Sequence, residues 1–179
     1  MGPGYGFQWR HFGAGASHYR GWDHDYTGVG IDQISTVLHN LKTDPFSRRH
    51  LVSAWCPTDE PFMALPPCHF SFQFVVKKAE PKNILDIIVM QRSADIILGV
   101  PSNITSYTMI LNIFCHYTGM VPGTLTHLMN HCHIYENHVD NAKVQLEKDV
   151  LPGPTLSMIN MPESFEDLTA DNFVVNNYK

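Results

Sequence analysis

Apolar residues recur along this chain at two different spacings, which predict helices in some segments and strands in others. Between residues 29 and 42 they return every three or four positions, as in an amphipathic helix, and Asp44-Pro45 ends the pattern. Nearly continuous runs of Val, Ile and Phe cover 69–76 and 84–90, separated by the polar turn 77–83. These two runs predict a mostly buried hairpin.

In the other segments, helices and strands do not alternate strictly. Residues 1–28 are rich in glycine, aromatic residues and histidine without a sustained period, so we expect a loop. Ser102 is expected to cap a central helix that runs to Tyr117 and ends at Gly119. The other expected elements are strands at 50–55, 124–130 and 156–160 and a helix from 134 to about 147. This order favours the α+β class, with a central sheet packed against helices.

Composition narrows the class of protein. A chain of 179 residues with 44% hydrophobic content is expected to form one domain, 1–179. It has no run of eighteen apolar residues and no basic-then-apolar leader, so a soluble protein is expected. The net charge of -5 argues against a general nucleic-acid binder. Four cysteines without a Cys-x-x-Cys pair favour reduced thiols in a cytosol-like compartment.

A single cysteine stands directly after two prolines in Leu65-Pro66-Pro67-Cys68-His69. Because proline fixes its own φ and pushes the residue before it toward extended geometry, the direction of the Cys68 thiol is set before any ligand binds. This indicates a nucleophile. The alternative is a buried cysteine that acts as a small hydrophobic side chain.

Two further clusters carry polar groups suited to an anionic ligand. Arg48 and Arg49 follow the turn at Asp44-Pro45, and two guanidinium groups can grip a phosphate; the alternative is a solvated surface pair. Gln91-Arg92-Ser93-Ala94-Asp95 and Gly99-Val100-Pro101-Ser102-Asn103 follow a buried strand and offer donors and acceptors for a phosphate and the edge of a base. The alternative there is a polar turn that caps the next helix.

The segment His131-Cys132-His133 raises the question of a metal. Two histidines at alternate positions of a strand share one face, and zinc would need two more ligands. Cys115, His116 and His138 are candidates only if the fold brings them close. Polar residues at a strand end are the better interpretation, and we expect no metal.

The order of these motifs resembles the thymidylate synthase family, in a form similar to that of vertebrates. The resemblance spans nearly the whole chain. It rests on Gly2-Pro3-Gly4-Tyr5-Gly6-Phe7-Gln8-Trp9-Arg10-His11, Asp32-Gln33, Asp44-Pro45, Ser47-Arg48-Arg49, Leu65-Pro66-Pro67-Cys68-His69, Gln91-Arg92-Ser93-Ala94-Asp95, Leu98-Gly99-Val100-Pro101, Asn103 and His133-Ile134-Tyr135.

The resemblance implies a methyltransferase that converts dUMP to dTMP, with 5,10-methylenetetrahydrofolate as the donor of both the one-carbon unit and the hydride. Cys68 and Asn103 would be the catalytic residues. Cys68 would be the nucleophile that attacks uracil C6, and Asn103 would recognise the edge of the uracil. Arg48 and Arg49 would reach the partner's site in a sheet-mediated homodimer. The other implied dUMP-binding residues are His69, Gln91, Arg92, Ser93, Asp95, His133 and Tyr135, and the implied folate-binding residues are Asp95, Leu98 and Gly99.

The resemblance also implies a cytoplasmic location, and members of the family occur in the nucleus or mitochondrion as well. The family's N-terminal third and C-terminal tail are expected to lie outside these 179 residues. We therefore expect the 179 residues by themselves to turn over substrate poorly. A non-enzymatic descendant and a nucleotide hydroxymethylase stay open as alternatives, although Asn103 tells against a cytosine substrate.

The sequence departs from the family pattern in three places. Asn130-His131-Cys132 replaces Gly-Asp-Ala, Ser102 replaces phenylalanine, and Cys56 replaces asparagine. Because a bulky side chain buried in place of glycine overpacks its surroundings, the strand end before His133 is expected to be distorted and less stable.

Overall fold

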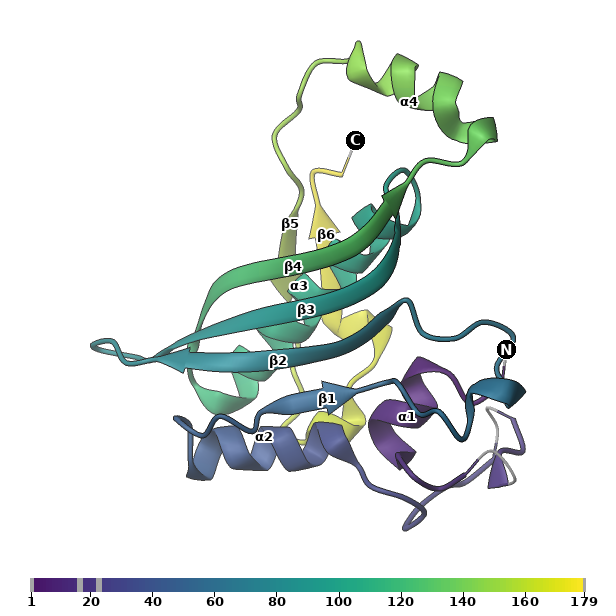
Figure 1. Ribbon diagram of the computed structural model, residues 1–179. Helices are drawn as coiled ribbons and strands as arrows, with labels where there is room; N and C mark the ends of the chain where they lie inside the picture. The colour runs from purple at the N-terminus through teal and green to yellow at the C-terminus, as the bar shows by residue number, and fades with distance from the viewer. Residues whose placement is uncertain (1, 16–17, 22–23, 179) are drawn as a thin grey trace. The chain divides into compact units, whose positions relative to one another are not determined.

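The computed structural model describes residues 2–15, 18–21 and 24–178, which fall into two compact units, Met1–Ile134 and Tyr135–Lys179 (Figure 1). Each unit is described by itself. The first contains α1 Tyr5–His11, α2 Gln33–Thr43, β1 Leu51–Ser53, η2 Glu60–Phe62, β2 His69–Lys77, β3 Ile84–Asp95, α3 Gly99–Thr118 and β4 Val121–His133. The second contains η3 Glu136–His138, α4 Val139–Leu146, β5 Thr155–Met158, η4 Phe165–Asp167, η5 Ala170–Asn172 and β6 Phe173–Asn176.

The first unit is built on a mixed four-stranded sheet in the order β1-β2-β3-β4 (Figure 1). β1, β2 and β3 pair antiparallel, which confirms the expected hairpin, whereas β3 and β4 pair parallel through the crossover helix α3. Mixed pairing with helices packed on the sheet confirms the α+β class. The parallel pair brings the ends of β3 and β4 to the same edge of the sheet.

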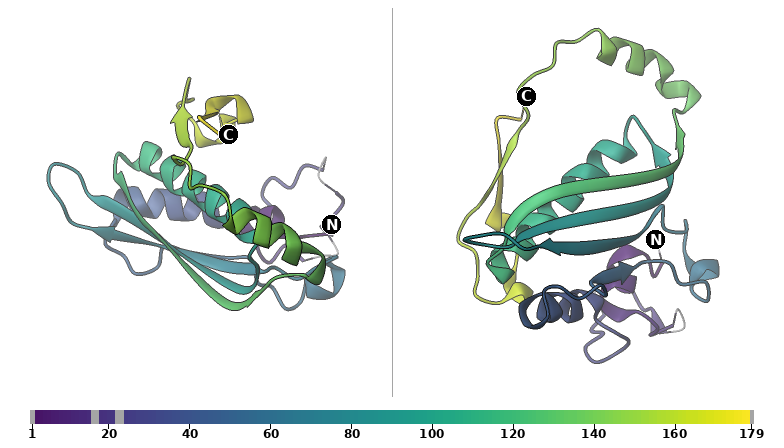
Figure 2. Two further views of the ribbon diagram at one scale, coloured as in Figure 1. Left: turned by 90° about the horizontal axis from the view of Figure 1, so that it is seen from above. Right: turned by 60° about the vertical axis from the view of Figure 1, so that its left-hand side comes forward.

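The core lies between the sheet and the helices α2 and α3. Alternate residues of β3, namely Leu85, Ile87 and Val89, are fully buried, and Tyr107 and Phe114 of α3 are almost fully buried. Burying side chains of this size contributes roughly 1.5–3 kcal/mol each. Figure 2 shows that no helix among the described residues of the first unit covers the opposite face of the sheet.

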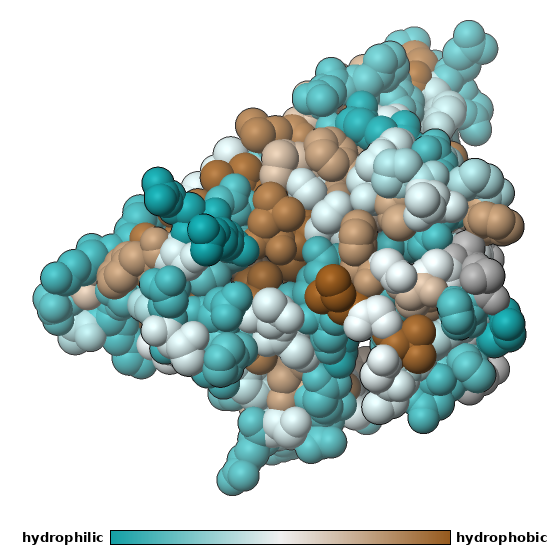
Figure 3. All heavy atoms as spheres, turned by 60° about the horizontal axis from the view of Figure 1, so that its bottom comes forward, coloured by the Kyte–Doolittle hydropathy of each residue, from teal (hydrophilic) through white to brown (hydrophobic). Residues whose placement is uncertain are grey.

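That uncovered face carries exposed or half-buried apolar residues on every strand. They include Leu51, Val75, Ile88, Met90 and Leu128. Alternation over residues 84–91 of β3 directs one set of side chains to the helices and the other set to this face. The turned view in Figure 3 shows apolar atoms reaching the surface in separate places among hydrophilic ones.

The structure refines the predicted helices of the first unit. α2 begins four residues after the predicted start at 29, because the Asp32 carboxylate accepts a hydrogen bond from the Ser35 N–H (3.0 Å) and caps the helix. The expectation of a loop over 1–28 is wrong at Tyr5–His11, where the chain forms α1. Its N-cap is Gly4, which has no side chain to cap the helix, and the buried side chains of Phe7 and Gln8 hold α1 to the rest of the unit.

The central helix starts earlier than predicted. α3 begins at Gly99, so the expectation that Ser102 caps it is wrong: the Ser102 Oγ instead donates to the Leu98 carbonyl (3.2 Å) from within the first turn. The predicted end is confirmed, because Gly119 takes a left-handed φ of 72° that favours glycine.

The strand end that departs from the family pattern is intact. β4 pairs with β3 through Ser93↔His131, Ala94↔Cys132 and Asp95↔His133, so the expected distortion is wrong. The physical reason is exposure: Asn130 and its two successors face solvent, and no buried space is overfilled. Cys56, in contrast, is buried, and its Sγ lies 3.2 Å from the Thr58 Oγ1.

The second unit contains the hairpin β5–β6, whose two strands pair antiparallel. The predicted helix from 134 is confirmed over Val139–Leu146, and the predicted strand over Thr155–Met158, whereas β6 was not expected. Asn172 closes a capping box with Thr169 and bonds the Asn160 carbonyl (2.8 Å), which ties the turn before β6. A single domain over 1–179 stays a prediction. None of the helices in the described ranges has the length and apolar character to cross a membrane.

The Gln33 side chain joins three elements and gives a first prediction. Its Nε2 donates to the carbonyls of Gln8 and Ser53 (2.8 Å each), and its Oε1 accepts from the Ser53 N–H (2.9 Å). Gln33→Leu would leave these backbone groups unpaired and lower the free energy of unfolding by about 2–4 kcal/mol in urea titrations. The exposed control His39→Ala, on the same helix, should stay within about 0.5 kcal/mol. Equal losses in both variants would contradict this.

Candidate functional site

Polar residues from four elements meet at one end of the sheet in the first unit. Cys68 and His69 stand at the start of β2, and the register places His69 opposite Gln91 on β3. Asp95, the last residue of β3, pairs with His133, the last residue of β4. The sheet thus gathers segments that are distant in the sequence into one cluster.

The loop before Cys68 is held by Arg92. The Arg92 Nε donates to the Pro67 carbonyl (3.0 Å), its Nη2 to the Pro66 carbonyl (2.8 Å), and its backbone N–H to the Cys68 carbonyl (2.8 Å). Its guanidinium also lies over the Trp55 ring, 5.6 Å from the centroid. A guanidinium has five N–H donors, so donors on Nη1 and Nη2 stay available to an anion.

A tyrosine completes the setting of Cys68. The Cys68 N–H donates to the Tyr5 hydroxyl (2.7 Å), and the Tyr5 ring stacks on His69 with centroids 3.9 Å apart. The half-buried Cys68 is therefore fixed by backbone contacts on both sides, to Tyr5 and to Arg92. The sequence motifs did not mark Tyr5 as a site residue, although it belongs to the segment Gly2–His11 that carries the resemblance.

The imidazole of His69 is neutral at physiological pH. Burial, with a smaller contribution from the charge of His127, lowers the pKa of His69 to about 4. Its Nδ1 lies 2.7 Å from the hydroxyl of Tyr107, whose own pKa is raised by burial. The sequence pattern did not mark Tyr107 as a site residue, because a helical pattern does not show where a hydroxyl points.

Gln91 is held in one orientation inside the sheet. It is 2% exposed, its Oε1 accepts from the His127 Nε2 (2.7 Å), and its Nε2 donates to the Ser93 carbonyl (2.8 Å). Burial lowers the pKa of His127, which keeps that ring neutral as a donor. Gln91 thus supports the backbone of the segment that carries Arg92 and Ser93.

The start of α3 adds three of the expected residues. A Cβ on Gly99 would lie 3.4 Å from the Cβ of Asp95 and 3.9 Å from the Oδ1 of Asn103, so these three residues are neighbours. The Asp95 Oδ1 accepts from the Ile97 N–H (3.2 Å), and Asn103 is half-buried. Leu98 is exposed beside them.

Arg48 and Arg49 lie away from this cluster. They precede β1, whose first residue Leu51 pairs with Gln73, five residues along β2 from Cys68 (Figure 1). At the rise of an extended strand, five residues span roughly 17 Å. Both side chains are exposed. The structure therefore does not bring these two arginines to the Cys68 of their own chain.

The last expected residues stand at and beyond the end of β4. His131 and His133 share a face, with ring centroids 5.5 Å apart, as their spacing predicted. Tyr135 is the first residue of the second unit and is exposed. Among the residues that the structure describes, no three His, Cys, Asp or Glu side chains are grouped as a metal ion would require.

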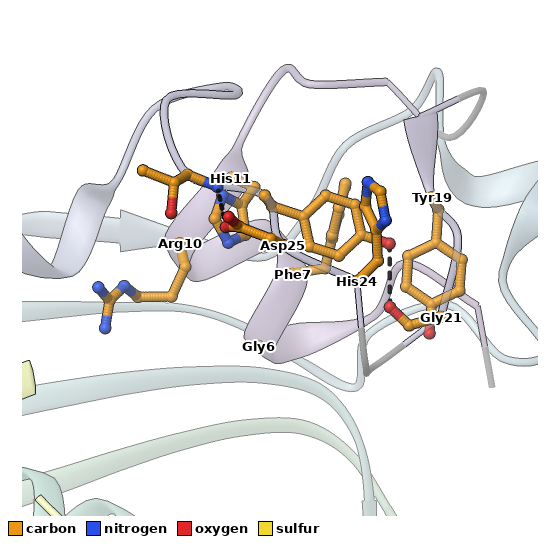
Figure 4. Close-up of a pocket in the computed structure, with 10 residues that line it drawn as sticks. Gly6, Phe7, Arg10, His11, Tyr19, Gly21, His24 and Asp25 are labelled. Carbon is orange, nitrogen blue, oxygen red and sulfur yellow. Dashed lines mark hydrogen bonds between the residues drawn. The ribbon is translucent and has the colours of Figure 1, made fainter. Parts of the chain in front are cut away.

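A separate cavity of about 400 Å³ lies beside α1 (Figure 4). Its wall includes the edge-to-face rings of Phe7, Tyr19 and Tyr26, and the Tyr26 hydroxyl donates to the Gly21 carbonyl (3.0 Å). None of the expected site residues lines it.

The neutral state of His69 predicts how acid affects stability. The unfolded chain binds this proton near pH 6.5 and the folded protein only near pH 4, so acid lowers the free energy of unfolding between these values. His69→Gln cannot titrate. In urea unfolding, the free energy of unfolding of the native protein should fall by roughly 3 kcal/mol more than that of His69→Gln when the pH is lowered from 7 to 4. Parallel pH curves for the two proteins would contradict the lowered pKa.

Comparisons with known proteins show the family to which the chain belongs. The family described as thymidylate synthase matches residues 1–179. The chain is 43% identical to the human thymidylate synthase over 178 residues, which are 99% of this chain and 55% of the relative. It is 45% identical to that of varicella-zoster virus, covering 57% of it, and 41% identical to that of Saccharomyces cerevisiae, covering 59%. The chain thus spans a little over half the length of these curated relatives, and it belongs to the thymidylate synthase family.

Proposed function

We propose that this protein catalyses the reductive methylation of dUMP to dTMP, with 5,10-methylenetetrahydrofolate as co-substrate. The observation that carries the proposal is the setting of Cys68, whose backbone is fixed between the Tyr5 hydroxyl and Arg92 beside a neutral His69. A thiol aimed in this way is suited to attack on an electrophilic ring carbon. Membership of the family supplies the substrate class.

In this mechanism the Cys68 Sγ forms a bond to C6 of the uracil, and the electron pair moves to C5. C5 then bonds the methylene carbon of the folate, C5 loses its proton to a base, and the bond from that carbon to the folate nitrogen breaks. The folate would then give a hydride to this carbon, which becomes the methyl group, and leave as dihydrofolate. As the hydride arrives, the bond between Sγ and C6 breaks, the C5–C6 double bond re-forms, and Sγ leaves as the thiolate. Splitting one difficult substitution into these steps is the advantage of a covalent nucleophile.

The remaining residues around Cys68 have proposed roles in binding. Arg92 would offer its unused donors, and Ser93 its hydroxyl, to the dUMP phosphate. The Asn103 amide would pair with the donor and acceptor of the uracil edge. The further dUMP-binding residues proposed are His69, Gln91, Asp95, His133 and Tyr135. Asp95, Leu98 and Gly99 would line the folate side.

We also propose a homodimer formed through the uncovered face of the sheet. Two observations support it. This face carries Val75, Ile88 and Leu128, and no helix in the part of the first unit that the structure describes lies over it. Arg48 and Arg49 also lie too far from their own Cys68 to reach it. In a twofold dimer each pair of arginines would reach the phosphate in the other chain's site. A cytoplasmic location is proposed with it.

Neither alternative activity is favoured. The curated relatives reported above all carry the name thymidylate synthase. An asparagine at position 103 fits uracil, whereas a cytosine-specific hydroxymethylase would favour aspartate there. A non-catalytic descendant would have no need of the fixed geometry around Cys68.

Covalent trapping tests the proposed nucleophile. With 5-fluoro-dUMP and 5,10-methylenetetrahydrofolate, the protein should form a complex that survives denaturation and adds the mass of both ligands. Cys68→Ala should abolish that mass shift, because the bond forms at Sγ. Cys132→Ala is the matched control, since Cys132 is an exposed cysteine on β4, and it should trap the ligands normally. Trapping by Cys68→Ala would refute the role of Cys68.

Mixed dimers test the proposed origin of the arginines. Cys68→Ala and the double variant Arg48→Ala/Arg49→Ala should each be inactive alone. When they are unfolded together and refolded, half of the dimers are heterodimers with one complete site each, so about a quarter of the native trapping capacity should return. Two controls in which each variant is refolded alone should stay inactive. No recovery in the mixture would contradict the exchange of arginines between chains.

A further inference from the structure

The turn that presents Arg48 and Arg49 is fixed at both of its ends. It connects α2 to β1, and at its beginning the Ser47 N–H donates to the Asp44 carbonyl (3.1 Å). At its end the Phe74 N–H of β2 donates to the His50 carbonyl (2.8 Å), which ties the backbone after Arg49 to the sheet. The two exposed guanidiniums therefore extend from a short segment between two anchored points.

His50 joins these two points through its side chain. It is 1% exposed, and its Nε2 lies 3.1 Å from the Pro45 carbonyl. Because a carbonyl only accepts, Nε2 carries the hydrogen and donates it. The ring thus closes the turn across five residues, with the two arginines inside the closed segment.

A histidine is a costly choice for this position. Its Nδ1 is also buried, and no hydrogen-bond partner for it exists among the residues described here. A buried polar atom without a partner costs free energy that an apolar side chain would avoid. Among the described residues, the hydrogen bond from Nε2 to the Pro45 carbonyl is the one polar interaction of the His50 ring. An aliphatic residue at this position could not make that bond.

We propose that His50 is a positioning residue for Arg48 and Arg49. By holding the turn closed, it presents the two guanidiniums in the geometry that the phosphate of a nucleotide in the partner's site requires. Binding then orders less of the chain, and a smaller ordering cost gives a tighter complex. The inference rests on the proposed function, because it assigns His50 to the phosphate-binding part of that same site.

Substitutions at His50 separate positioning from packing. In His50→Gln the side-chain amide nitrogen takes a place near that of Nε2 and can donate to Pro45, whereas His50→Leu fills the space without a donor. We expect His50→Leu to raise the dissociation constant for dUMP about tenfold and His50→Gln to stay within about twofold of native. The KM for 5,10-methylenetetrahydrofolate should be unchanged in both. If His50→Leu does not fold, His50→Asn replaces it, because its shorter amide does not reach Pro45.

The decisive measurement repeats His50→Leu in the Arg48→Ala/Arg49→Ala background. If His50 acts through the arginines, the substitution should not weaken dUMP binding further there, since residues that act through each other are not additive. An equal loss in both backgrounds, or native affinity in His50→Leu, would overturn the inference. If the double arginine variant itself binds dUMP normally, the proposed role of the arginines fails instead.

Discussion

The geometry of the cluster depends on one interaction, the grip of Arg92 on the loop before Cys68. Pro66 and Pro67 cannot donate backbone hydrogen bonds, so this loop cannot join a strand ladder through them, and their carbonyls need donors from elsewhere. Arg92 supplies two side-chain donors in a planar fork and pairs its own backbone with Cys68. The end of β3 is thereby attached to the start of β2 at the position where the thiol emerges.

Topology explains why so many polar residues share that place. A hairpin puts the start of β2 beside the end of β3, and the parallel crossover through α3 puts the ends of β3 and β4 together. The first turn of α3 follows β3 after only three residues, which brings Gly99 and Asn103 against Asp95. One hairpin and one crossover therefore suffice to bring together residues that lie as far apart in the sequence as Cys68 and His133.

The sequence predicted well those elements whose signal is local. Asp32 caps the start of α2 and the left-handed Gly119 ends α3, so these two helix ends lie close to where the sequence pattern predicted them. The α1 helix escaped prediction because its seven residues have no capping bond and are stabilised by burial of Phe7 and Gln8, which a local pattern does not contain. Motif order identified Cys68 and its polar neighbours, but Tyr5 and Tyr107 join them only through stacking and hydrogen bonding in three dimensions.

The distance between Cys68 and the arginine pair also has a genetic consequence. Under the proposed arrangement each reaction centre is assembled from two subunits. A subunit with an intact Cys68 is therefore inactive when its partner carries a defective Arg48 or Arg49. Loss-of-function alleles that affect Cys68 should therefore complement alleles that affect the arginine pair in the same cell, whereas two alleles of the same group should not. In a heterozygote, a lesion in either group would affect assemblies that also contain a normal copy.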